Sequence, residues 1–170
     1  MPVAVAAFSV GVCVLTLNAG AMWHEWLTRT LPAAASFRLL VIDSSSDDET
    51  ANAARQAGLE VVVIERRDFD HGGTRQRALL QLDDCDIVIF LTQDALVVGA
   101  DALTRLVAAF EDPQVGAAFG RQLPHQGATP VAAHARYFNY PPQSRVVGSE
   151  DVPRLGIKTA FLSNSFAAYR

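Results

Sequence analysis

Polar side chains that directly follow apolar runs of the sequence could bind a ligand. Asn18 follows the first run, Asp43 ends the second, and Asp94, preceded by Gln93, follows Ile87–Leu91. A carboxylate at position 43 can accept hydrogen bonds from the ring N–H groups of a base or from ribose hydroxyls. The carboxylate at 94 suits a hard divalent cation, which is commonly held by one or two carboxylates together with substrate phosphates. The alternatives are that Asp43 caps a helix and that Asp94 begins a turn.

The densest polar stretch of the chain is Arg66–Arg77, in which Gly72-Gly73 precedes Arg75. Adjacent glycines let backbone amides approach a ligand closely. Cations in the first turn of a helix are unfavourable by about 0.3–1 kcal/mol each, and a bound anion would reverse that penalty. The stretch is equally consistent with an anion site around Arg75 and with arginines neutralised at the surface by Asp68 and Asp70.

Apolar runs that alternate with helical patterns predict the elements that must position these side chains. Strands are expected at 7–17, 37–42, 59–64, 86–91 and 115–119, and helices at 22–31, 44–58, 72–82 and 101–110. The helix at 44–58 rests on the hydroxyls and carboxylates of Ser44–Thr50, which are typical of a helix start. This order predicts an α/β fold, with a mostly parallel open sheet and helices on both faces. Ligands bind beyond the carboxyl ends of such strands, so Asp43 and Asp94 are expected to converge there, both accessible to a ligand.

The chain is expected to form a single domain over residues 1–170, with a βα core at 1–120 and an irregular segment at 121–170. Residues 121–156 contain five of the eight prolines, around a short helix expected at 131–138, and a late strand is expected at 157–162. Residues 1–120 carry a net charge of −8 and residues 121–170 a net charge of +4. The basic segment could face a phosphate group or a lipid headgroup, or it could be an ordinary uneven surface.

Composition argues against several classes of protein. Half of the 170 residues are apolar, enough for a sizeable core and too many for a disordered chain. The net charge of −4 argues against a general nucleic-acid binder, and Cys13 and Cys85 are expected to be free thiols. The first turn lacks a dinucleotide fingerprint, and the single lysine, Lys158, lies in no phosphate loop. Nicotinamide enzymes and P-loop kinases are therefore disfavoured.

The N-terminal run Pro2–Leu17 is uncharged and mostly apolar, a pattern that signal segments share. No Lys or Arg precedes the run, since the first is Arg29, so the usual basic start of a signal peptide is missing. The run is also shorter than the about 20 residues that a spanning helix needs. Its valines favour a buried parallel strand.

Six motifs in series resemble the family 2 glycosyltransferases, and within them the bacterial rhamnosyltransferases. The motifs are Leu15–Gly20, Val41–Thr50, Phe69–Arg75, Phe90–Ala95, Gly120–Pro124 and Ser163–Arg170. The resemblance extends over nearly the whole chain. It implies a GT-A fold that binds a nucleotide sugar, either dTDP-rhamnose or a UDP-sugar, together with Mg²⁺ or Mn²⁺.

The resemblance also implies roles for individual residues. Those implied in nucleotide binding are Asn18, Asp43, Gly72, Arg75 and Asp94. Asp94 would in addition hold the metal ion on the diphosphate, and Arg121 and Asn164 would lie on the acceptor side. The implied acceptor is a saccharide or lipid-linked saccharide of a cell-surface polysaccharide. The implied location is cytoplasmic and compatible with peripheral association at the inner face of the cytoplasmic membrane, with no nucleic-acid partner.

The chain departs from the family pattern at three points. Leu15 stands where a proline is common, and Asp94 is one carboxylate where many relatives have two. The family's catalytic base lies in a Glu-Asp motif downstream of the Ser-Asn to Tyr-Arg segment, which would fall beyond Arg170. Glu150-Asp151 precedes that segment and is in the wrong order. We therefore expect the donor-binding part of a longer, inverting, metal-dependent enzyme, truncated at its C-terminus. The alternatives are a non-catalytic nucleotide- or sugar-binding remnant and an unrelated Rossmann-like methyltransferase.

Overall fold

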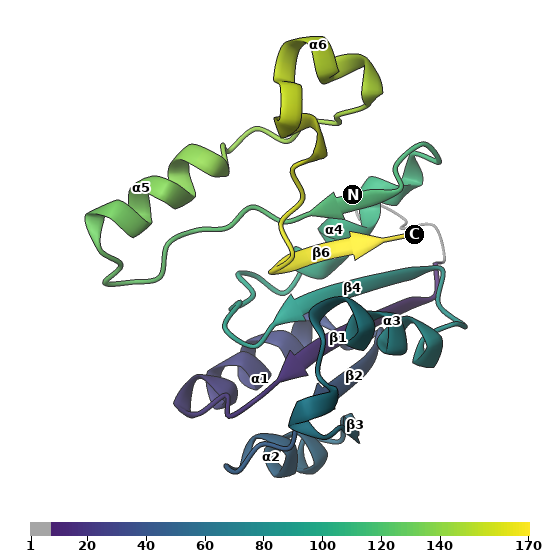
Figure 1. Cartoon of the computed structure of the whole chain (residues 1–170), viewed down its shortest axis with the longest axis vertical. Coiled ribbons are helices and arrows are strands. Elements are labelled where there is room, and N and C mark those ends of the chain that lie inside the picture. Colours follow the sequence, from purple (N-terminus) through teal and green to yellow (C-terminus); the bar gives the residue numbers. More distant parts are fainter. Residues whose placement is uncertain (1–7) are drawn as a thin grey trace.

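A six-stranded sheet forms the centre of the molecule in the computed structural model, which describes residues 8–170 (Figure 1). The strands are β1 (Val10–Thr16), β2 (Arg38–Asp43), β3 (Glu60–Val63), β4 (Ile87–Thr92), β5 (Ala117–Phe119) and β6 (Phe166–Tyr169). The α-helices are α1 (Ala21–Ala33), α2 (Thr50–Gln56), α3 (His71–Gln81), α4 (Ala102–Val107), α5 (Pro130–Asn139) and α6 (Val152–Leu155). Short 3₁₀ helices are η1 (Arg66–Asp68), η2 (Ala108–Glu111), η3 (Ser149–Asp151) and η4 (Gly156–Ala160).

The strand order is β3-β2-β1-β4-β6-β5. Strands β3, β2, β1 and β4 are parallel, whereas β6 runs antiparallel to both β4 and β5. The predicted mostly parallel open sheet is therefore confirmed, with β6 as its one reversed strand among the described residues. The chain winds from β1 out to β3 and then returns to place β4 on the other side of β1. Ligands of open α/β sheets bind at such a reversal of strand order.

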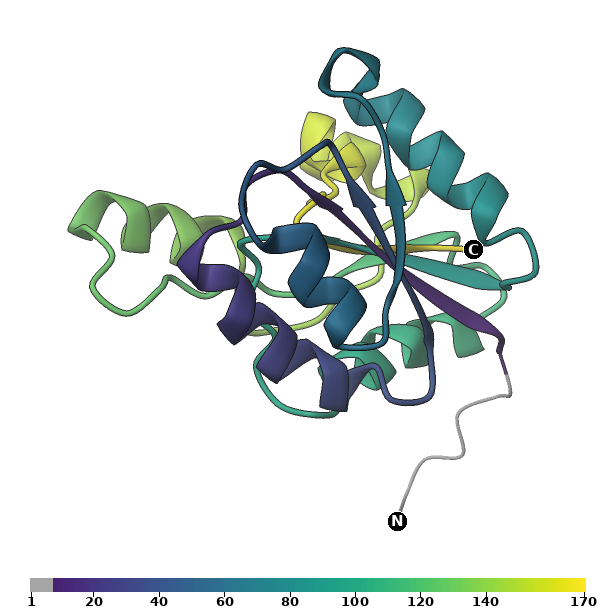
Figure 2. The same ribbon diagram turned by 90° about the horizontal axis from the view of Figure 1, so that it is seen from below.

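Helices cover both faces of the sheet, as predicted, because successive side chains of each strand point to opposite faces. Val12 and Val14 of β1 pack with the helices α1, α2 and α4, whereas Cys13 packs with α3. Figure 2 shows α3 on the opposite side of the strands from the other three helices. On the α1 face, Trp23 and Trp26 stack with their ring centroids 4.7 Å apart. Val10, Val12 and Val14 of the N-terminal run are buried as expected, while residues 1–7 lie outside the described part.

One predicted helix starts later than expected, and one predicted strand is wrong. Helix α2 begins only at Thr50, and the serines and aspartates before it form a loop. The predicted strand at 157–162 is largely the 3₁₀ helix η4, in which Ile157 is 92% exposed. The last strand is β6 instead, where Ala167 and Ala168 are fully buried between β4 and β5. The helix expected at 131–138 is confirmed as α5.

The junction of β5 with β6 requires a glycine. A β-carbon added at Gly120 would lie 2.1 Å from Cδ1 of Phe166, whereas one added at Gly116 would have no atom within 4 Å. We predict that Gly120→Ala lowers the free energy of unfolding by about 1–3 kcal/mol, because the ring must shift or the strands separate. Urea denaturation measures the effect, and Gly116→Ala is the control, expected to change stability by less than about 0.5 kcal/mol. Equal stabilities for the two variants would show that the junction tolerates a side chain.

Candidate functional site

A cavity of about 280 Å³ opens at the carboxyl ends of β1 and β4, where the strand order reverses. Its volume is close to the lower end of the roughly 300–1,000 Å³ typical of ligand sites. The apolar lining residues are Leu15, Leu17, Phe69, Phe90 and Leu91. The polar lining residues are Thr16, Ser44, Arg66, His71, Arg75, Thr92 and Gln93. An apolar wall with a few convergent polar groups is typical of a small-molecule site.

Three buried polar atoms of this lining have no hydrogen-bond partner among the described residues. They are the Ser44 Oγ, the Thr92 Oγ1 and the Arg75 Nε. A buried polar group without a partner costs about 1–3 kcal/mol. Two hydroxyls and a guanidinium N–H together suit a ligand with several polar oxygens, because the hydroxyls donate or accept and the guanidinium only donates.

Arg75 is held in the cavity by neutral partners. Its Nη1 donates to the His71 carbonyl oxygen at 3.1 Å, and its Cζ lies 5.7 Å from the Phe90 ring centroid. No ion pair among residues 8–170 includes this guanidinium. Asp70, which could have neutralised it, caps α3 by accepting from the Gly73 amide. For Arg75 the arrangement favours the anion-site interpretation over neutralisation at the surface.

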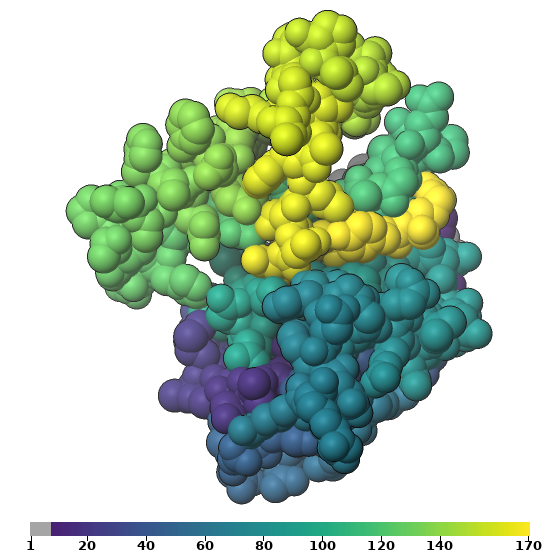
Figure 3. Space-filling model, in the orientation of Figure 1, coloured from purple at the N-terminus to yellow at the C-terminus, as the bar shows by residue number. Residues whose placement is uncertain are grey.

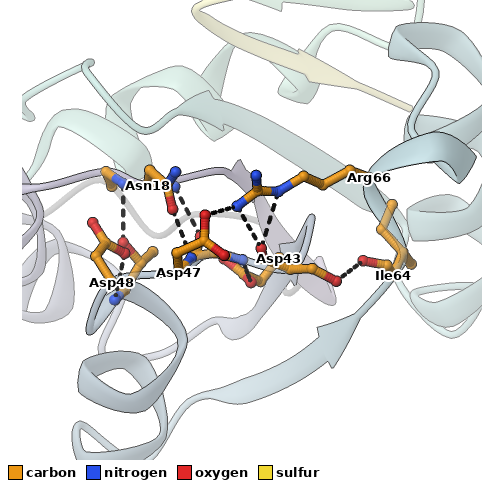
Figure 4. A network of polar contacts seen from close by, with 10 residues as sticks. Asn18, Asp43, Asp47, Asp48, Ile64 and Arg66 are labelled. Carbon is orange, nitrogen blue, oxygen red and sulfur yellow. Dashed lines mark hydrogen bonds and ion pairs between the residues drawn. The ribbon is translucent and has the colours of Figure 1, made fainter.

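The turn after β1 is held by side chains from two other loops. Four consecutive amides each donate to a side-chain oxygen: Leu17 to Gln93 Oε1 at 2.8 Å, Asn18 to Ser46 Oγ at 2.8 Å, Ala19 to Thr50 Oγ1 at 2.9 Å and Gly20 to Asp48 Oδ2 at 3.0 Å. In return, Asn18 Oδ1 accepts from the Asp47 amide at 2.8 Å (Figure 4). These contacts explain why the 44–50 segment does not begin a helix: its oxygens serve the neighbouring turn instead of capping α2.

Asp43 lies in the interior, with 1% of its surface exposed. Its carboxylate accepts from Thr16 Oγ1 at 2.8 Å, from the Ser46 amide at 2.8 Å and from Ser46 Oγ at 2.6 Å. The expectation of an accessible carboxylate is therefore not met, because Asp43 holds the loop that carries Ser44 into the cavity. The alternative that Asp43 caps the next helix is wrong as well, since Glu49 occupies that position.

Arg66 closes the same loop from the side of η1. Its guanidinium donates to the Ser45 carbonyl oxygen at 3.0 Å and forms an ion pair with Asp47. Ser45 in turn donates through its hydroxyl to the Ile64 carbonyl oxygen at 2.7 Å. Figure 4 shows Arg66 reaching across this loop toward Asp47.

Asp48 serves the same loop as a hydrogen-bond acceptor. Its carboxylate accepts from the Thr50 and Gly20 amides. These hydrogen bonds, with those to Thr50 the largest contribution, hold the pKa of Asp48 below its usual value.

Gln93 connects the loop after β4 to the turn after β1. Its side-chain amide accepts from the Leu17 amide and donates to the Leu17 carbonyl oxygen at 3.2 Å. The next residue, Asp94, is exposed and has no hydrogen bond or ion pair within the described range. No group of three or more metal-ligating side chains occurs among the described residues. A single free carboxylate fits a cation that takes its remaining ligands from substrate phosphates and water.

The predicted nucleotide-binding residues all lie at this edge of the sheet, but only Arg75 lines the cavity. Each of the other four adjoins a lining residue in sequence: Asn18 follows Leu17, Asp43 precedes Ser44, Gly72 follows His71, and Asp94 follows Gln93. Sequence reasoning assigned no binding role to the lining side chains other than Arg75. The signal was present, because every lining residue except Arg66 lies within one of the six motifs.

The two predicted acceptor-side residues lie near β6 and carry local structure. The Arg121 Nε donates to the Tyr140 carbonyl oxygen at 3.0 Å, and Asn164 Oδ1 accepts from the Tyr169 hydroxyl at 3.0 Å. Their role toward an acceptor stays a prediction.

Both cysteines are free thiols, as expected. Burial raises the pKa of Cys13 to about 12, against a smaller lowering by the positive charge of Arg75. Partial burial and then the Asp84 carboxylate raise the pKa of Cys85. Neither thiol is therefore suited to act as a nucleophile at neutral pH.

An open α/β sheet with a cavity at its switch point places the chain in a class of folds that commonly bind nucleotides at that point. Residues 12–170 match the family described as glycosyl transferase family 2, and the chain belongs to this family. The membership removes the methyltransferase alternative.

The chain is 45% identical over 163 residues to the O-antigen chain rhamnosyltransferase RfbN of Salmonella typhimurium. It is also 45% identical over 164 residues to the O-antigen chain rhamnosyltransferase WbaN of Salmonella anatum. Each alignment covers 95% of this chain and 52% of the relative. The chain thus spans about half the length of the curated relatives it matches.

Solved glycosyltransferase structures share the fold. The mannosyltransferase PcManGT from Pyrobaculum calidifontis, in complex with GDP-Man and Mn²⁺, aligns with a TM-score of 0.63 and 21% identity over 96% of this chain and 45% of its own. Glucosyl-3-phosphoglycerate synthase from Mycobacterium tuberculosis, in complex with UDP, aligns with a TM-score of 0.61 and 17% identity over 96% of this chain and 57% of its own. At these identities the likeness shows the fold alone, and it confirms the expected GT-A architecture.

Ser46 allows a test of the hydrogen bonds that join the turn after β1 to the loop after β2. Its hydroxyl donates to the buried Asp43 carboxylate and accepts from the Asn18 amide. We predict that Ser46→Ala lowers the free energy of unfolding by about 1–3 kcal/mol, because an amide and a buried carboxylate each lose a partner. Urea denaturation measures it, with the exposed Ser36→Ala as a control expected to change stability by less than about 0.5 kcal/mol. Equal values for both variants would contradict the role assigned to the network.

Proposed function

We propose that residues 1–170 form one domain that binds a nucleotide sugar in the cavity between β1 and β4. The observation that carries this proposal is that three residues with an unpartnered buried polar atom, Ser44, Arg75 and Thr92, all line one cavity at the switch point. Family membership supports the same class of ligand. Since the relatives in Salmonella are named rhamnosyltransferases, we propose dTDP-rhamnose as the donor, with a UDP-sugar as the second choice.

The lining gives each part of such a donor a chemically suitable partner. Phe69 and Phe90 offer apolar surface to a base or a sugar ring. Arg75 offers a cation without a counter-charge, and charge-assisted hydrogen bonds from arginine to phosphate are among the strongest in proteins. The Ser44 and Thr92 hydroxyls can bond ribose or phosphate oxygens.

A divalent cation, Mg²⁺ or Mn²⁺, would be held by Asp94 together with the donor's diphosphate. Bound there, it would neutralise the charge that develops on the departing nucleotide diphosphate. Gln93 would fix the loop that carries Asp94 relative to the turn after β1, through its paired hydrogen bonds with Leu17. The carboxylate would then face the diphosphate without reorganisation of the loop.

In the reaction that we propose for a chain of the relatives' length, an acceptor hydroxyl attacks the anomeric carbon from the face opposite the diphosphate. The configuration at that carbon inverts, and a carboxylate takes the hydroxyl proton. We propose a saccharide or lipid-linked saccharide as acceptor, and peripheral location at the inner face of the cytoplasmic membrane. No helix of the described residues is long and apolar enough to cross a bilayer.

One observation favours the second candidate, a domain that binds the donor without transferring it. The 121–170 segment contains two acidic residues, Glu150 and Asp151, and Asp151 accepts from the Gly148 amide and pairs with Arg154. These contacts, that of Arg154 foremost, hold the pKa of Asp151 below its usual value and make it a weaker base. Sugar transfer by the 170-residue chain would eliminate this candidate.

Calorimetry with dTDP and UDP, in Mn²⁺ and in chelator, tests the donor site. We predict that Asp94→Asn lowers the affinity measured in Mn²⁺ to the value in chelator. Arg75→Met should weaken binding in both conditions by at least about tenfold, because it removes a charge-assisted hydrogen bond.

Asp101→Asn, an exposed change at the N-cap of α4, is the matched control and should bind as the unsubstituted chain does. Absence of heat with either nucleotide in Mn²⁺ would overturn the proposed function. Unchanged metal dependence in Asp94→Asn would overturn the role of Asp94 alone.

A further inference from the structure

The segment between β5 and β6 projects from the sheet and leaves apolar side chains in solvent. In Figure 3 its two parts, coloured green and yellow-green, stand out from the body of the molecule. None of the helical elements α5, η3, α6 and η4 contains a buried residue. The large exposed apolar residues of the segment are Leu123, Val131, Tyr137, Phe138, Val146, Val152, Ile157 and Phe161.

Helix α5 and the 3₁₀ helix η4 together carry one exposed surface. Val131 and Phe138 lie on the same face of α5, because residues seven apart are nearly two full turns apart. They are 80% and 66% exposed. The Lys158 Nζ lies 5.3 Å from the Phe138 ring centroid, so η4, which also carries Ile157, adjoins the C-terminal end of α5. We call the surface made by Val131, Phe138, Ile157 and Lys158 the α5–η4 surface.

The segment that carries this surface has a net charge of +4 over residues 121–170. Residues 113–149 contain no Asp or Glu but contain Arg121, Arg136 and Arg145. The first carboxylates after them are Glu150 and Asp151, and Asp151 is already paired with Arg154. Residues 1–120, by contrast, carry a net charge of −8. Most of the large exposed apolar side chains therefore occur in the part of the chain where the charge is positive, although Leu80 and Val98 are exposed in the acidic part.

We propose that the α5–η4 surface binds an anionic phospholipid bilayer. Interfacial binding draws on both features, apolar side chains that enter the headgroup boundary and cations that attract anionic lipids. A neutral protein partner would cover the apolar side chains but would have no use for the positive charge, so the charge favours lipid. The inference rests on the peripheral location proposed above and identifies the surface and the lipid class responsible. Figure 1 shows α5 on the side toward which β4 points, so the same end of the molecule carries the donor cavity.

Vesicle co-sedimentation of the 170-residue chain tests the proposal. We expect binding to phosphatidylcholine vesicles that contain a quarter phosphatidylglycerol, and at least about tenfold weaker binding to pure phosphatidylcholine. Raising NaCl to 0.5 M should weaken the binding to anionic vesicles, because salt screens the attraction. No binding to either vesicle, or equal binding to both, overturns the proposal.

Substitutions locate the surface. Arg145→Glu with Lys158→Glu should weaken anionic-vesicle binding by about twentyfold or more, since each cation near the surface contributes about fivefold. The matched control is Arg55→Glu with Arg105→Glu, which changes two exposed arginines of the βα core. Phe138→Asp should weaken binding by at least about tenfold, whereas Leu80→Asp on α3, 68% exposed, should leave it unchanged. Unchanged binding in the Phe138 and Arg145/Lys158 variants overturns the assignment of the surface.

Light scattering and nucleotide calorimetry separate the remaining outcomes. If Phe138→Asp changes the oligomeric state but not vesicle binding, a second copy covers the surface and the proposal is wrong. Nucleotide binding should be the same in all these variants, because none alters a residue of the cavity. A chain that binds vesicles but no nucleotide would refute the proposed donor site and leave the lipid surface standing.

Discussion

Four consecutive backbone amides, those of residues 17–20, are the constraint on which the arrangement of the site depends. They lie at the point where β1 ends, and each donates to a side chain from the loop after β2, from Thr50 at the start of α2, or from the loop after β4. Because unpaired amides are costly, the three segments must keep one relative placement. In many nucleotide-binding folds the corresponding amides face phosphate. Here these amides already donate to side chains of the protein, which agrees with the missing glycine-rich fingerprint. The anion binding that we propose would therefore fall to Arg75.

The sequence patterns that predicted the fold are those with a local physical cause. Runs of buried, β-branched residues such as Val10–Val14 identify parallel strands, since such strands are covered on both faces. The predictions failed where a partner distant in sequence decides the structure. Ser46 and Asp48 have the chemistry of helix caps, but the nearest unpaired amides in space belong to Asn18 and Gly20. Ile157 belongs to an apolar run, yet the strand that pairs with both β4 and β5 is β6, which contains Ala167 and Ala168.

The sequence predicts at which edge of the sheet the site lies, but it does not predict which side chains face the cavity or which atoms they contact. Topology brings Asp43 and Asp94 to the carboxyl ends of β2 and β4, but it does not fix whether a carboxylate faces inward or outward. Asp43 turns inward because Thr16 and Ser46 both donate to it. The unpartnered atoms of Ser44 and Thr92 could be found only from coordinates, because a serine or threonine after a strand usually bonds to its own backbone. Family resemblance located the right motifs, which contain every lining residue except Arg66, but of the residues to which it gave a nucleotide-binding role only Arg75 lines the cavity.

The junction of β5 with β6 has a consequence for the segment between them. The chain leaves the sheet at Gly120 and returns at Phe166, and these two residues are joined by a backbone hydrogen bond of 2.9 Å. Residues 121–165 therefore form an insertion whose two ends lie next to each other at one point of the sheet. Such an insertion can change in length and sequence without altering strand order or register. Evolution can thus exchange this part of the molecule as a unit while the donor cavity keeps its shape.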